Sequence, residues 1–151
     1  MNQLKKIIMM TSAVIALSVI APVNAEHHEP HIDKSSKVTF KLVMQGLLSD
    51  TKMMTQGIIL RDFGLVEFAA NRIVNHPKPA MSQRKKLMKA LGSDTETFKG
   101  YDHVVHGGAI KIKQAAKDKD MVVVIAEYQQ VITGCQSCHS LFKAELSKAL
   151  R

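Results

Sequence analysis

The sequence has no tryptophan, only four prolines and eight glycines, and only 5% aromatic residues. A β-sandwich needs frequent turns rich in glycine and proline, and a collagen-like chain needs far more of both, so neither class fits. Hydrophobic residues make up 46% of the 151 positions, which is enough to bury the core of one domain. A disordered or multidomain chain is therefore not expected.

Acidic residues are also few, at 13 against 21 lysines and arginines, which gives a formal net charge of +8. Such a surplus suits a nucleic acid, an anionic membrane surface or an acidic protein partner. The basic residues are scattered, and the only three in a row are Arg84-Lys85-Lys86, which is typical of solvated helix faces. This scatter, together with the export signal described next, argues against nucleic acid.

The one long apolar run lies at the N-terminus. Lys5 and Lys6 precede an almost entirely apolar stretch at 7–20, and Val23-Asn24-Ala25 has the small residues of a signal-peptide cleavage site. The run is too short for a typical transmembrane helix. We expect a signal peptide at 1–25, a flexible arm at 26–34 and a folded domain at 35–151, with no membrane insertion after cleavage.

Cleavage after Ala25 would leave Glu26-His27-His28 as the new N-terminus. The free amine, two amide nitrogens and the imidazole of the third residue can surround a square-planar Cu(II) or Ni(II) ion, and His31 could assist. Histidines in an arm are also often incidental. Both interpretations stay open.

The rest of the chain has the periodicity of four amphipathic helices. The first is expected to be capped by Ser35 or Ser36 and to end near Gln56. Its inner face, at alternating spacings of four and three, consists of Phe40, Met44, Leu47, Thr51, Met54 and Ile58, widened by Val43 and Leu48. After a connection at 57–61, Asp62 is expected to cap a shorter second helix, whose inner face consists of Val66, Ala69, Ala70 and Ile73.

The segment His76-Pro77-Lys78-Pro79 ends that helix, and a short helical turn is expected at 82–90, ending at Gly92. Ser93-Asp94-Thr95-Glu96 has the pattern of a capping box that opens the third long helix. The inner face of this helix consists of Phe98, Tyr101, Val105, Ala109, Ile112 and Ala116.

A turn at Asp118-Lys119-Asp120 leads into a last helix over 121–150, which contains one glycine, Gly134, and no proline. No pair of alternating strands is found. The fold class predicted is all-α, an up-down-up-down four-helix bundle. Gly107-Gly108 inside the third long helix indicates a close approach by a bound group or by a neighbouring helix, or a kink.

Both cysteines lie in the last helix, in Cys135-Gln136-Ser137-Cys138-His139. A spacing of three places both sulfurs on one helix face, where each can form a thioether with a vinyl group of haem while His139 binds the iron. A thiol-exchange site would instead lie at a helix N-terminus, and a zinc site lacks further ligands nearby. One covalently attached haem c is therefore the predicted cofactor.

The run Cys135-x-x-Cys138-His139-x-x-Phe142-Lys143, in an exported helical bundle, resembles the class II c-type cytochromes, which are cytochrome c-prime and its six-coordinate low-spin relatives. The resemblance covers the whole mature chain, and Lys143 matches the basic residue that commonly follows the ligating histidine by four. It implies haem attachment in a bacterial periplasm and allows a homodimer.

The resemblance fails at one position. High-spin members often carry an arginine on the first helix near the haem propionates, whereas this chain has only Lys41 in that neighbourhood. Lys41 is a candidate propionate partner, although a solvated lysine fits as well.

Met44 is the predicted sixth ligand. The first and last helices of such a bundle are antiparallel, so depth from the start of one can be compared with depth from the end of the other. Met44 lies nine residues after Ser35, roughly 14 Å, and His139 lies eleven before Leu150, roughly 16 Å. The competing interpretation is that Met44 only fills the core, as Met53 and Met54, about 14 to 15 Å deeper, are expected to do.

His106 is the alternative sixth ligand, on the flank of the third long helix. Asp102 precedes it by four residues, so the two are also expected to pair on the helix face. His103 points away from the predicted core and is assigned to the surface.

These features predict a periplasmic monohaem cytochrome that carries single electrons and is not an enzyme. Its positive surface suits redox partners with acidic surfaces. The alternative is a five-coordinate haem protein that binds nitric oxide or carbon monoxide, because the first helix offers only apolar or thioether side chains on the distal side of the haem. A peroxidase would need distal acid-base groups, and His106 is the only one found.

Overall fold

The computed structural model describes residues 38–150. Within them lie α1 (Phe40–Leu60), α2 (Phe63–Val74), α3 (Met81–Leu91), the 3-10 turn η1 (Gly92–Asp94), α4 (Thr95–Lys117) and α5 (Met121–Ala149). This part of the chain contains no strand, which confirms the all-α prediction. The signal peptide, the arm with Glu26-His27-His28 and the predicted caps Ser35 and Ser36 lie outside the described residues.

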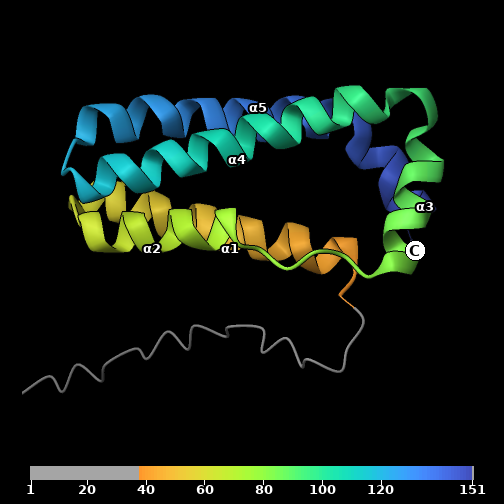
Figure 1. Cartoon of the computed structure of the whole chain (residues 1–151), viewed down its shortest axis with the longest axis horizontal. Helices are drawn as coiled ribbons and strands as arrows, with labels where there is room; N and C mark the ends of the chain where they lie inside the picture. The colour runs from red at the N-terminus through yellow and green to blue at the C-terminus, as the bar shows by residue number, and fades with distance from the viewer. Residues whose placement is uncertain (1–37, 151) are drawn as a thin grey trace, which may run out of the picture. The chain divides into compact units, whose positions relative to one another are not determined.

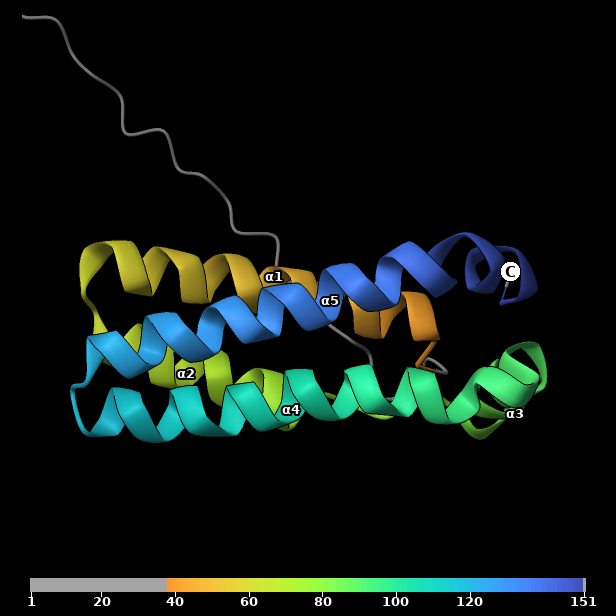
Figure 2. The same cartoon turned by 90° about the horizontal axis from the view of Figure 1, so that it is seen from above.

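Helices α1, α2, α4 and α5 run alongside one another, and α3 lies across one end (Figure 1). Their directions alternate along the chain, as the colour gradient in Figure 2 shows. Helix α4 packs extensively against α5 and α2, and α2 packs against α1, whereas α1 and α5 approach each other at few positions. The α1–α5 edge is therefore the loosest of the four contacts.

The core consists of two clusters. The larger contains every predicted inner-face residue of α2 and, from α4, Ala109, Ile112 and Ala116; Met54, Val124 and Val131 join it from α1 and α5. The smaller, near α3, contains Leu87, Leu91 and Leu146, with the rings of Phe40, Phe98 and Phe142 packed against it. Met53 and Met54 both pack in the larger cluster, as predicted.

The first helix differs from its prediction at both ends and at Leu48. Thr39 caps it by accepting a hydrogen bond from the Leu42 amide at 3.2 Å. The helix continues past Gln56 to Leu60, because Gly57 does not break it: a Cβ there would lie 2.8 Å from Cγ2 of Val66, so the glycine lets α2 approach. Leu48 is 56% exposed and does not widen the inner face.

Asp62 caps α2 as predicted, by accepting from the Leu65 amide at 3.0 Å. The predicted capping box at 93–96 is wrong. Asp94 makes no side-chain cap, and its backbone (φ −85°, ψ 5°) is not extended as a capping box requires. The chain instead continues from α3 through η1 into α4, and Thr95 Oγ1 donates to the Gly92 carbonyl at 2.9 Å.

A neighbouring helix explains one glycine of the Gly107-Gly108 pair. A Cβ on Gly108 would lie 2.7 Å from Cγ2 of Val131 on α5, whereas a Cβ on Gly107 would meet nothing within 4 Å. On the other helix, a Cβ on Gly134 would lie 3.1 Å from Cγ1 of Val104. Gly108 and Gly134 thus let α4 and α5 pack closely.

One carboxylate is buried in the interface between α1 and α2. Asp50 has only 4% of its surface exposed, and one of its oxygens accepts a hydrogen bond from Nε of Arg72 at 2.6 Å.

None of the helices at 38–150 is both long and apolar enough to span a membrane.

Candidate functional site

The cysteine-histidine motif lies in the second half of α5. Cys135 and Cys138 are free and half-buried, and Cys135 packs against the larger core cluster. His139 is exposed. The helix therefore turns both sulfurs inward and leaves the imidazole at the surface.

Burial raises the pKa of the Cys135 thiol above its usual value, and a backbone hydrogen bond only partly offsets this. Burial also raises the pKa of Cys138, with smaller contributions from Cys135 and Asp102. A thiol-exchange site needs the opposite shift, because the thiolate is its nucleophile. The environment of the two thiols thus disfavours that interpretation.

The contact between α1 and α5 fixes the register of the predicted iron ligands. Thr55 Oγ1 lies 2.6 Å from the Tyr128 hydroxyl, so these two residues mark one level. Met44 lies eleven residues before Thr55 on α1, and His139 lies eleven after Tyr128 on α5. Eleven residues are close to three helical turns, roughly 16 Å, and the two helices are antiparallel. Counted from this contact, Met44 and His139 lie at similar depths in the bundle, to within about one helical turn, because the tyrosine side chain itself reaches about that far.

A pocket of about 870 Å³ opens beside Met44. It is lined by residues of α1, α3 and α4, by Val74 at the end of α2, and by the connection that follows α2. No residue of α5 lines it. Its apolar lining is Phe40, Val43, Met44, Val74, Pro79, Met81, Leu87, Met88 and Phe98, and its polar lining is His76, Lys78, Arg84, Lys85, Lys99, Asp102, His103 and His106. Its volume lies within the range of roughly 300–1,000 Å³ typical of cofactor pockets.

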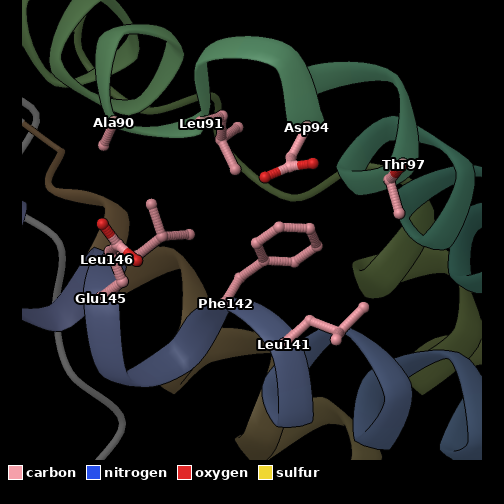
Figure 3. Close-up of a pocket in the computed structure, with 8 residues that line it drawn as sticks. All are labelled: Ala90, Leu91, Asp94, Thr97, Leu141, Phe142, Glu145 and Leu146. Atoms are coloured by element: carbon pink, nitrogen blue, oxygen red, sulfur yellow. The ribbon is translucent and has the colours of Figure 1, made fainter.

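A smaller pocket of about 190 Å³ lies on the α5 side of the aromatic cluster, lined partly by Leu141 and Phe142 (Figure 3). The Phe142 ring packs edge-on against Phe98, with 5.8 Å between centroids, and Phe98 is 6.2 Å from Phe40. These rings connect α5 to the wall of the larger pocket. The smaller pocket is below the usual volume of a cofactor site.

The structure also brings together two histidines that are 30 residues apart. Nε2 of His76 lies 3.1 Å from Nε2 of His106, and Oδ1 of Asp102 lies 3.8 Å from the latter, which confirms the expected Asp102–His106 pair. The sequence assigned to His76 only a place in a helix-ending segment. No local signal could have found this pair, because a connection brings His76 to α4.

The other predicted residues have mixed outcomes. Lys41 is exposed and does not line the larger pocket, whereas His103 lines it. Met81 and Met88 also line it from α3, and no signal in the sequence singles them out among the methionines as thioether ligands.

No protein-family model, curated protein or solved structure matches the chain. The donor set is compatible with a c-type haem: two half-buried thiols three residues apart, an imidazole beside them, and a thioether at similar depth on the antiparallel helix α1.

Proposed function

We propose that the chain is a periplasmic class II c-type cytochrome, with one haem attached through Cys135 and Cys138. His139 is the proximal iron ligand and Met44 the sixth ligand. The function is transfer of single electrons between redox proteins.

The observation that carries this proposal is the contact of Thr55 with Tyr128 at 2.6 Å, since counting from it along α1 and α5 gives Met44 and His139 similar depths. The few contacts between α1 and α5 also support it, because a flat cofactor held between these helices needs them apart. His106 fits the sixth position less well, since its Nε2 already faces His76.

A bound haem supplies reversible one-electron chemistry. The protein's part is to hold it rigidly: the two cysteines anchor it to α5, and the close packing of α4 against α5 keeps that helix in place. Exposure of His139 keeps the motif near the surface, where an electron can reach a partner. The surplus of basic residues suits partners with acidic surfaces.

The test is an optical spectrum of the haem-loaded protein and of Met44→Ala. The wild type is expected to be low-spin in both oxidation states, and Met44→Ala is expected to become high-spin and lose the sulfur-to-iron charge-transfer band. Met88→Ala is the matched control, because Met88 lines the same pocket from α3, and its spectrum should not change.

A low-spin Met44→Ala protein with the band unchanged would remove Met44 as ligand and make His106 the next residue to replace. A high-spin wild type would instead favour a five-coordinate protein that binds nitric oxide or carbon monoxide.

A further inference from the structure

The Nε2 atoms of His76 and His106, which form a hydrogen bond in this structure, have the separation of two ligands on one metal ion. Their Nε2 atoms lie 3.1 Å apart, and the ring planes are tilted by 51°. Two nitrogens each roughly 2.0–2.1 Å from a zinc ion are about 3 to 3.4 Å apart at angles near the tetrahedral value. The observed separation falls within that interval.

The backbone orients His76 for this role. Its Nδ1 lies 3.0 Å from the Pro77 carbonyl oxygen. A carbonyl oxygen only accepts hydrogen bonds, so Nδ1 carries the hydrogen and Nε2 of the neutral ring keeps its lone pair, which accepts a hydrogen bond from Nε2 of His106 in this structure. Metal-binding histidines are commonly held in this way, with the outer N–H on a backbone carbonyl.

A third ligand is close. The Oδ1 atom of Asp102, one turn before His106 on α4, lies 3.8 Å from His106 Nε2. Within residues 38–150 no three such side chains already surround a common point, so a rotation of Asp102 or a water molecule would complete the coordination.

We infer that His76 and His106, assisted by Asp102, form a second metal site, independent of haem, for a borderline divalent ion such as Zn(II). On binding, the His106 proton moves from Nε2 to Nδ1, so both rings stay neutral. Neutral imidazole selects zinc, copper or nickel over magnesium or calcium, which require mainly oxygen ligands. The lysines and Arg84 that line the same pocket are solvent-exposed, so their repulsion of the ion is screened.

The experiment is calorimetric titration of Zn(II) into the chelator-treated, haem-loaded protein in a background of His27→Ala, His28→Ala and His31→Ala, which removes the N-terminal histidines. One site is expected. His76→Ala and His106→Gln should each weaken zinc binding at least about tenfold, and Asp102→Asn should weaken it less. His103→Ala is the matched control from the same helix and pocket, and it should leave the affinity unchanged.

Circular dichroism of each variant should keep the wild-type helical signal. The proposal is overturned if the parent does not bind zinc, or if His76→Ala and His106→Gln bind zinc as tightly as the parent does. It is also overturned if His103→Ala loses as much affinity as these two variants. A change in the haem spectrum of His106→Gln would assign this histidine to the iron and also overturn it. Failure of the cytochrome proposal is distinguished by the same titration of a haem-free Cys135→Ala, Cys138→Ala chain, in which the two thiols cannot bind zinc and the His76–His106 site should still do so.

Discussion

Cys135 and Cys138 are half-buried on α5, and their surroundings disfavour the thiolate form before any cofactor is attached. Burial is the main cause that raises the pKa of each, and the proximity of Cys135 contributes to that of Cys138. A thiol with a raised pKa in the folded state favours folding at low pH, and that contribution is lost as pH rises through the folded pKa. Attachment of each sulfur as a thioether would remove this pH dependence.

We therefore predict that the haem-free chain is alkylated by iodoacetamide more slowly when folded than in denaturant, because fewer thiolates are present at a given pH. The measurement is the alkylation rate as a function of pH. The midpoint of this curve should lie at higher pH for the folded chain than for the denatured chain. In Cys135→Ser the pKa of Cys138 should fall, since one cause of its shift is removed. A folded curve at lower pH than the unfolded one would instead indicate a thiol-exchange site.

Residues that act within one helix were predictable from the sequence, and residues that meet across helices were less so. The spacing of Cys135 and Cys138 places both on one face of α5, and the structure has them half-buried together. The contact of His76 with His106 depends on how the connection after α2 approaches α4, which no local pattern encodes.

At the scale of the helices, the close packing of α4 on α5 depends on Gly108. We predict that Gly108→Ala destabilises the protein by about 1–3 kcal/mol, because the added methyl group would overlap the buried Val131. Gly107→Ala is the matched control. It should stabilise the protein by about 0.5–1 kcal/mol, since a Cβ there meets no neighbour and alanine is the better helix former.

Urea unfolding of both variants checks this pair. Changes of the same sign and size would show that helix propensity alone, and not the α4–α5 contact, accounts for the two glycines.

The contrast between local interactions and contacts across helices also explains which helix boundaries were predicted correctly. The Asp62 cap and the turn at 118–120 follow from local hydrogen bonds and were found. Gly57 looked like a helix end but lies inside α1, because its role is to admit Val66 of the neighbouring helix. The pattern at 93–96 matched a capping box, but the continuous turn from α3 into α4 leaves no extended residue to act as the cap.

At the scale of the whole molecule, the all-α fold followed from periodicity, while the register between helices did not. Sequence depth alone placed Met44 near the level of His139, but it used Ser35, which lies outside the described residues, as the origin. The contact of Thr55 with Tyr128 supplies an origin inside the fold, from which the two residues have similar depths to within about one helical turn. Charge and composition carry no information on register, because they do not depend on which residues face each other.

The central claim, one haem attached through Cys135 and Cys138, is tested most directly by the intact mass of the denatured mature protein, produced in a periplasm that attaches haem. The predicted mass is that of the chain from Glu26 to Arg151 plus one haem, retained after extraction with acidified acetone, and a Cys135→Ala, Cys138→Ala variant should have the mass of the chain alone. A wild-type chain without added mass, or haem removed by the extraction, would contradict the account.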